Sequence, residues 1–157
     1  TYVFHSNRDD NKLIHKYIED SKMSNCHVIS NDKIKSHLLK KSIFAVSKSG
    51  TVSLEICNAK IPSIIIYKIN FINFLIIKSL VKIKYVNIIN IVANDEIIPE
   101  LLQSKCNSEN IFKVVNTYLE SPLKIKDQIN KTEKIINILK TDSSSAKLAS
   151  LAINKFL

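Results

Sequence analysis

Short apolar runs alternate with segments of helical periodicity along the first half of this 157-residue chain. The clearest run is Ile64-Ile65-Ile66-Tyr67, which is continuous and β-branched, as is typical of a strand covered on both faces. Alternation of strands and helices implies right-handed crossovers between parallel strands. The sequence therefore predicts an α/β fold, a Rossmann-like parallel sheet with helices on both faces.

The spacing of the apolar residues gives the expected elements. Strands are expected at 2–5, 26–30, 43–47 (expected to be buried) and 64–67, and helices at 11–20, from 31 or 32 to 40, and at 52–59. Beyond Pro99 the pattern becomes helical, with segments at 100–103, 108–119, 125–139 and 146–157. These helices are expected to follow the sheet as a C-terminal extension.

Gly50 is the only glycine of the chain, and it lies between an expected strand and an expected helix. Average usage of about 7% would give roughly eleven glycines. Glycine permits a tight turn with positive φ, and the first N–H groups of the following helix can accept a phosphate. Ser49 and Thr51 are both candidate N-caps; with Thr51 as the cap, Glu55 falls one residue too late to close a capping box. The motif predicts an anion site or, alternatively, only a good helix start.

The net charge of +9 comes almost wholly from lysine, since Arg8 is the only arginine. Recognition of phosphates and bases usually favours the fork of arginine, so charge alone gives little support for nucleic-acid binding. The three cysteines and four histidines are scattered, which indicates neither a disulfide framework nor a metal site. We expect no metal, no cofactor, no nucleic-acid partner and a cytoplasmic location. No signal peptide is expected, and a start at Thr1 inside an expected strand suggests a piece of a longer protein.

The segment 61–77 is strongly apolar but is interrupted by Pro62, Lys68, Asn70 and Asn73. A membrane span needs about 20 predominantly apolar residues, so this segment is expected to be a strand, a turn at Asn70 and a short helix over 71–81. That helix is expected to be a half-buried core helix or, alternatively, to rest on a membrane surface or a partner domain.

A series of short motifs occurs in the order and at the spacing found in lipid-A-disaccharide synthases. Each motif alone is weak, whereas the ordered series is specific and is strongest over residues 43–103. The motifs are Ser-Gly-Thr-Val-Ser-Leu-Glu (49–55), Ala-Lys-Ile-Pro (59–62), Tyr-Lys (67–68), Leu-Val-Lys-Ile-Lys-Tyr-Val (80–86), Asn-Ile-Val-Ala (90–93) and Glu-Ile-Ile-Pro-Glu-Leu-Leu-Gln (96–103). The chain resembles the C-terminal, UDP-sugar donor-binding half of this family.

The resemblance implies a metal-independent, inverting glycosyltransferase of the two-domain GT-B type. Such enzymes transfer a 2,3-diacylglucosamine unit from UDP to 2,3-diacylglucosamine 1-phosphate in lipid A biosynthesis. Residues 1–103 would be a partial donor-binding domain, and 104–157 a helical extension packing on it or on the missing N-terminal half. That half supplies the catalytic base, so the resemblance places no catalytic residue here and predicts inactivity in isolation. It also implies a homodimer and peripheral contact with the inner face of the inner membrane.

The resemblance also assigns the nucleotide-sugar site. Ser49, Gly50 and Thr51 would lie against the diphosphate. The ribose hydroxyls would be reached by Glu55. Further polar positions that line the donor side are matched by Asn90, Glu96, Glu100 and Gln103. The alternative for these four is a helix surface or a complement to a helix dipole.

Several positions depart from the family pattern. Asn94-Asp95 replaces a usual Gly-Arg, which exchanges a cation for an anion and places an αL-tolerant Asn at the turn. Lys60 replaces a helix-end glycine, at a cost near 1 kcal/mol if the position needs positive φ. Ser143 or Ser144 stands where the family has a proline before its last helix. These departures keep open the alternative of a decayed, non-catalytic fragment; a basic RNA-associated domain is the remote alternative.

Overall fold

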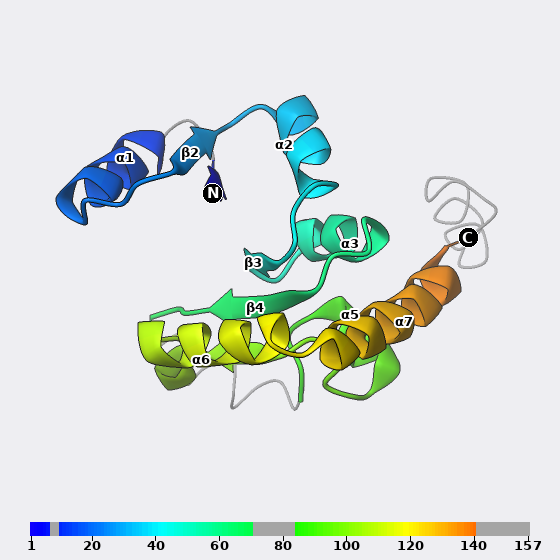
Figure 1. Cartoon of the computed structure of the whole chain (residues 1–157). Coiled ribbons are helices and arrows are strands. Elements are labelled where there is room, and N and C mark those ends of the chain that lie inside the picture. Colours follow the sequence, from blue (N-terminus) through cyan, green and yellow to red (C-terminus); the bar gives the residue numbers. More distant parts are fainter. Residues whose placement is uncertain (7–9, 71–83, 141–157) are drawn as a thin grey trace, which may run out of the picture. The chain divides into compact units, whose positions relative to one another are not determined.

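The computed structural model describes residues 1–6, 10–70 and 84–140 and shows parallel sheets flanked by helices (Figure 1). The expected Rossmann-like α/β class is thereby confirmed. The chain divides into two compact units, Thr1–Ser42 and Ile43–Leu157, which are described separately below. The helices expected at 71–81 and 146–157 lie outside the described residues.

The first unit is a strand–helix–strand crossover followed by one more helix. Its elements are β1 (Tyr2–His5), α1 (Asn11–Asp20), β2 (Cys26–Ile29) and α2 (Asp32–Leu39). Strands β1 and β2 pair in parallel, with Tyr2 opposite Cys26. The Asn31 side chain accepts the N–H groups of Lys33 and Ile34 at 2.9 and 3.2 Å, which starts α2 where an N-cap was expected.

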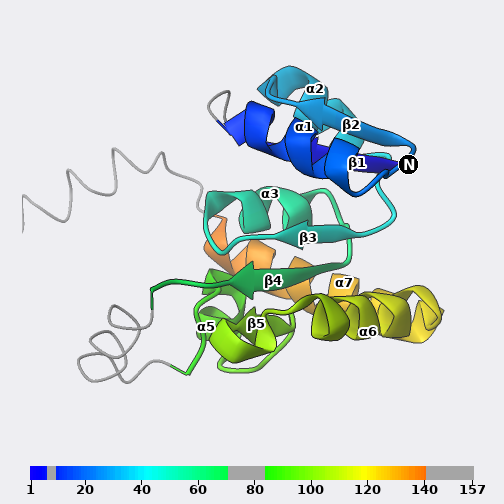
Figure 2. The ribbon, with the colours of Figure 1, turned by 90° about the vertical axis from the view of Figure 1, so that its left-hand side faces the viewer.

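The second unit contains a three-stranded parallel sheet in the order β3-β4-β5 (Figure 2). Its strands are β3 (Ala45–Ser47), β4 (Ser63–Tyr67) and β5 (Glu100–Leu102). Ile64 and Ile65 in the central strand are 0% exposed, as predicted from their continuous apolar run. The register places Ala45 opposite Ser63 and Ile65 opposite Glu100.

Two expectations about this sheet are wrong. The run 43–47 is not buried: Ile43 is 76% and Val46 45% exposed, because β3 is short and lies at the edge of its sheet. Residues 100–103 do not form a helix. Instead 100–102 are β5, and Gln103 opens the 3₁₀ turn η2 (Gln103–Lys105). Pairing with β4 overrides the helix propensity of Glu, Leu and Gln, which is a weak determinant by comparison.

Four helices complete the described part of this unit: α3 (Thr51–Asn58), α5 (Ile88–Ala93), α6 (Ser108–Leu119) and α7 (Pro122–Leu139). Helix α7 packs against the other three. It begins three residues earlier than expected, because Ser121 caps it and Pro122 suits the first helical position. Its Ile135 and Ile136 join a core that also contains Ile65, Ile89 and Ile98.

Within the described ranges, no helix combines the length and the apolar character needed to cross a membrane.

Candidate functional site

The turn between β3 and α3, residues 48–51 and hereafter the Gly50 turn, depends on its glycine. Gly50 has φ +141° and ψ −163°, and it is the N-cap residue of α3. No atom lies within 4 Å of the place where a Cβ would be, so the backbone conformation and not the lack of space requires glycine. Positive φ at Gly50 is therefore confirmed.

The expected N-caps of α3 are wrong. Thr51 is already the first helical residue, and among the described residues no side chain caps this helix. The Ser53 hydroxyl donates back to the Gly50 carbonyl at 2.6 Å, so it does not cover the first N–H groups. The start of α3 therefore presents the positive end of the helix dipole, with no side-chain acceptor from the described residues.

The Gly50 turn lies at the carboxyl edge of the sheet. It directly follows Ser47, the last residue of β3, and all three strands run in the same direction (Figure 2). In open α/β sheets, ligands bind at this edge. The fold thus brings an uncapped helix start to the edge where a nucleotide is expected.

Ser49 does not cap the helix but ties the turn to a distant segment. Its hydroxyl donates to the carbonyl of Val86 at 2.7 Å. The N–H groups of Val86 and Asn87 each donate to the Glu100 carboxylate at 2.9 Å. Asn87 caps α5 by accepting the N–H of Ile89 at 2.9 Å. The Gly50 turn is therefore joined through Val86 to a carboxylate on β5.

Asn90 and Glu100 are buried, at 0% and 8% exposure, so neither lies on a helix surface. The Asn90 amide donates to Glu100 at 2.8 Å and to the Ile98 carbonyl at 2.7 Å, and its oxygen accepts the Ile98 N–H at 2.9 Å. Both side chains thus hydrogen-bond within the fold, between α5 and the start of β5. Their assignment to the donor side of a sugar nucleotide stays a prediction.

The other predicted site residues are more dispersed. The Gln103 side chain accepts the N–H of Ile69 at 2.9 Å and donates to its carbonyl at 3.3 Å, which fixes the chain just after β4. Glu96 is exposed and accepts the Glu100 N–H at 3.2 Å. Thr51 and Glu55 are exposed on α3. Hydrogen bonds connect Asn90 and Glu96 directly to Glu100, and Ser49 to Glu100 through Val86. Gln103 belongs to a separate pair with Ile69.

Sequence reasoning missed Asn87, which is 0% exposed. Its Nδ2 and the Ser47 Oγ are the two buried side-chain atoms that find no hydrogen-bond partner in the described part of the chain. Ser47 ends β3, and Asn87 follows the residue that holds Ser49. The signal for Asn87 was present in the sequence: an Asn directly before an apolar helical run is a typical N-cap.

Lys60 and Asn94, which replace residues of the family pattern, both have the left-handed backbone conformation that glycine favours. Lys60 has φ +58°, so the position does favour glycine. The Lys60 N–H donates to the carbonyl of Cys57, and the Ile61 N–H donates to the carbonyl of Ile56. These two bonds are the pattern of a Schellman helix end. Asn94 is left-handed, with φ 51° and ψ 30°, and ends α5.

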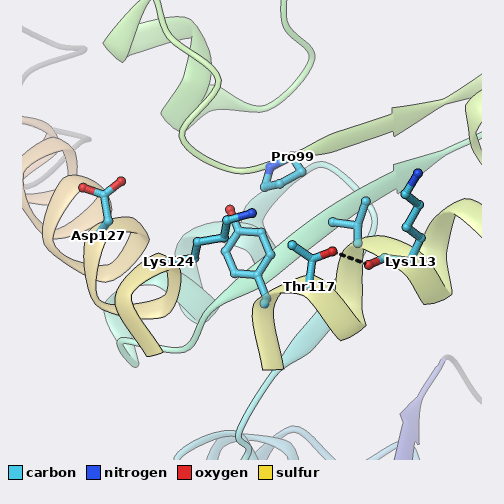
Figure 3. Close-up of a pocket in the computed structure, with 7 residues that line it drawn as sticks. Pro99, Lys113, Thr117, Lys124 and Asp127 are labelled. Carbon is cyan, nitrogen blue, oxygen red and sulfur yellow. Dashed lines mark hydrogen bonds between the residues drawn. The ribbon is translucent and has the colours of Figure 1, made fainter. Parts of the chain in front are cut away.

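A hollow of about 390 Å³ lies between α6 and the start of α7 (Figure 3). It is lined by Pro99, Lys113, Val114, Thr117, Tyr118, Lys124 and Asp127. Pro99 precedes β5, so this hollow lies toward the edge where the strands begin. It contains none of the predicted site residues. Burial, and secondarily the Asp127 carboxylate, raise the pKa of Tyr118 and keep its hydroxyl protonated.

In the described ranges, no three His, Cys, Asp or Glu side chains come together to hold a metal ion. The three cysteines are free thiols, and Cys57 is buried. Burial raises the pKa of Cys57 to about 11, so its thiol is neutral and unreactive at physiological pH.

The parallel sheet with its flanking helices and a glycine turn at its carboxyl edge places the chain in the class of Rossmann-like α/β domains. The sequence model of the lipid-A-disaccharide synthetase family matches residues 1–154. The chain belongs to this family, a family of glycosyltransferases.

Similar proteins are named lipid-A-disaccharide synthase. The protein of Rickettsia prowazekii (strain Madrid E) is 37% identical over 144 residues, which are 92% of this chain and 37% of that protein. The protein of Rickettsia bellii (strain OSU 85-389) is 37% identical over 134 residues, 85% and 34% of the two chains. That of Rickettsia canadensis (strain McKiel) is 38% identical over 132 residues, 84% and 33%. The chain thus spans about a third of the length of these relatives.

Proposed function

We propose that this chain is the donor-binding portion of a lipid-A-disaccharide synthase and that the Gly50 turn receives the diphosphate of UDP-2,3-diacylglucosamine. The full enzyme would transfer the diacylglucosamine unit to 2,3-diacylglucosamine 1-phosphate, releasing UDP. The observation that carries the proposal is the uncapped start of α3 at the carboxyl edge of a parallel sheet.

The neighbouring contacts support this placement. In the described part of the chain no side chain accepts the first N–H groups of α3. The Ser53 N–H bonds to the Gly50 carbonyl at 3.1 Å, and an anion would satisfy the N–H groups that precede it. The buried Nδ2 of Asn87 is a further donor without a partner in the described residues, one residue from the carbonyl that holds Ser49. Glu55 is exposed five residues after Gly50 on the same helix, and its carboxylate would accept the ribose hydroxyls.

The proposed role is binding and orientation of the donor, not proton transfer. No described residue at the Gly50 turn forms a paired base and nucleophile. Catalysis would need the portion of the relatives that this chain does not match, and the chain alone would be inactive. The helix dipole, equivalent to about half a positive charge, and the backbone N–H groups would stabilise the diphosphate. The proposal includes no metal and no cofactor. The lipid substrates imply work at a membrane surface, on its cytoplasmic side.

A UDP titration of the 157-residue chain tests the proposal. We expect binding with a Kd of about 1 mM or tighter, since a helix start supplies several charge-assisted bonds. Glu55→Ala should abolish the binding, whereas Glu109→Ala, a matched change at an exposed glutamate in the first turn of α6, should leave it intact.

Absence of UDP binding at any accessible concentration would instead support a decayed fragment of the family. Complementation gives a second test: the chain mixed with the separately made N-terminal portion of a relative should form disaccharide only when both are present.

A further inference from the structure

Glu100 holds two consecutive peptide groups. Its Oε2 accepts the N–H of Val86 and its Oε1 the N–H of Asn87, both at 2.9 Å, and Oε1 also accepts the Asn90 amide at 2.8 Å. The residue is 8% exposed and lies on β5. Bonds from backbone N–H groups to a buried carboxylate are charge-assisted and are stronger than bonds between neutral groups. The segment before α5 is thus fixed by one side chain.

Val86 transmits this constraint to the Gly50 turn. Its N–H is held by Glu100, and its carbonyl accepts the Ser49 hydroxyl at 2.7 Å. Ser49 is the residue before Gly50, so a displacement of Val86 would move the backbone that presents the start of α3. The path from Glu100 to the turn consists of two hydrogen bonds and one residue.

Glu100 is itself fixed from a second side. Asn90 binds both the N–H and the carbonyl of Ile98, two residues before Glu100, and donates to the carboxylate. The Glu100 N–H also donates to Glu96 at 3.2 Å. The carboxylate therefore cannot turn toward a ligand without giving up three hydrogen bonds.

We infer that Glu100 is a positioning residue for the phosphate turn and acts through Val86 and Ser49 rather than by touching the sugar nucleotide. This inference rests on the proposed function for its ligand, but the coupling between Glu100 and Gly50 exists without nucleotide. It reassigns one of the residues that the family resemblance placed on the donor side.

The single glycine makes the coupling measurable. Labelling the full chain with [¹⁵N]glycine gives one amide signal, that of Gly50. We expect Glu100→Gln to shift this signal in the nucleotide-free chain. The Val86 and Asn87 N–H groups bond to different carboxylate oxygens, and in Gln one of these oxygens becomes an NH2 group that cannot accept. The matched control Glu109→Gln should leave the signal in place. In a Ser49→Ala background, Glu100→Gln should cause no further shift, since the connection to the turn is already broken.

If Glu100→Gln shifted the Gly50 signal only through a general loss of stability, its shift would add to that of Ser49→Ala in the double variant. If it acts through Ser49, the additional shift is absent from the double variant. The inference is overturned if Glu100→Gln shifts the signal no more than the control does, or shifts it equally with and without Ser49. Should Glu100→Gln unfold the chain, Glu100→Asp replaces it in the same measurement, because aspartate keeps two carboxylate oxygens on a shorter side chain. We expect Glu100→Asp to shift the Gly50 signal from its wild-type position, and to cause no further shift in the Ser49→Ala background.

Titration with UDP then separates the two proposals. Glu100→Gln should weaken UDP binding by about tenfold, and Ser49→Ala,Glu100→Gln by no more than Ser49→Ala alone. If the wild-type chain binds no UDP, the proposed function fails while the nucleotide-free shifts still decide the role of Glu100. If UDP binds equally to Glu100→Gln, the proposed function stands and the positioning role fails.

Discussion

Gly50 combines φ +141° with ψ −163°, a region that residues with a Cβ enter only under strain. We predict that Gly50→Ala lowers the free energy of unfolding by about 1–3 kcal/mol, although a methyl group would meet no atom within 4 Å. Urea unfolding measures the loss. Thr51→Ala at the next, exposed position is the control and should change stability by less than about 0.5 kcal/mol. An equal effect of the two changes would contradict the assignment of strain.

Lys60 has φ +58°, a backbone conformation in which glycine is preferred over a residue with a side chain. Its ammonium also bonds to Glu133 at 2.7 Å, so removal of the side chain has two effects. Comparison of two variants isolates the backbone term, because both lose the ion pair. Lys60→Gly should be more stable than Lys60→Ala by about 1 kcal/mol in urea unfolding. Alanine equal to or better than glycine would show that the left-handed conformation is not costly here.

The buried thiol of Cys57 makes stability depend on pH in the alkaline range. Burial raises its pKa from 9.0 to about 11, so between these values the unfolded chain releases a proton that the folded chain keeps. Stability is therefore full below pH 9 and falls as pH rises through 11, by about 2–3 kcal/mol in total. Urea unfolding of Cys57→Ala should show a flatter profile than wild type from pH 8 to 11. Cys26→Ala should keep the wild-type slope.

At the scale of elements, Gln128 attaches α7 to the sheet. Its oxygen accepts the Ser63 N–H at 2.7 Å, and its amide donates to the carbonyls of Ser63 and Ile97 at 3.0 and 3.2 Å. Gln128→Ala would leave the buried Ser63 peptide unpaired, and we predict a loss of about 2–4 kcal/mol in urea unfolding. Asn130→Ala at an exposed position of the same helix should cost less than about 1 kcal/mol. Similar losses would exclude the proposed attachment.

Element type could be predicted wherever local sequence decided it. The central strand β4 is an unbroken β-branched run, and α1, α2 and α6 show apolar periodicity with clear boundaries. Strand β5 could not be predicted this way, because Glu-Leu-Leu favours a helix and only pairing with β4 makes it extended. The exposure of β3 likewise follows from its edge position, a property of the sheet and not of the run itself.

In the candidate site, too, some features follow from local sequence and others depend on contacts between distant elements. The positive φ of Gly50 follows from its residue type and its place between a strand and a helix. The bond from Ser49 to Val86 spans 37 residues, and the burial of Asn90 and Glu100 depends on α5 meeting β5. Spacing along the chain contains no information about such contacts. Motif positions alone therefore could not separate a residue that touches a ligand from one that holds the backbone behind it.

At the scale of the whole molecule, buried side chains are distributed unevenly. Every described residue in the unit Thr1–Ser42 is partly or fully exposed, whereas the core residues lie between Ser53 and Ile136. The first unit is thus held mainly by the pairing of β1 with β2 and by short helices without buried residues. Backbone hydrogen bonds with little apolar burial open at a small fraction of the global unfolding energy.

We therefore predict two levels of amide protection in hydrogen exchange of the full chain. Amides of Ile64 and Ile65 in β4 should exchange at the rate set by global unfolding. Those of β1 and β2 should exchange at least about 100-fold faster, after correction for intrinsic rates. A substitution in the core, Ile89→Val, should speed exchange in β4 while leaving β1 and β2 unchanged, because only global opening exposes β4. Equal protection in β2 and β4 would mean that the two units unfold together, and the core between Ser53 and Ile136 would then stabilise the whole described chain.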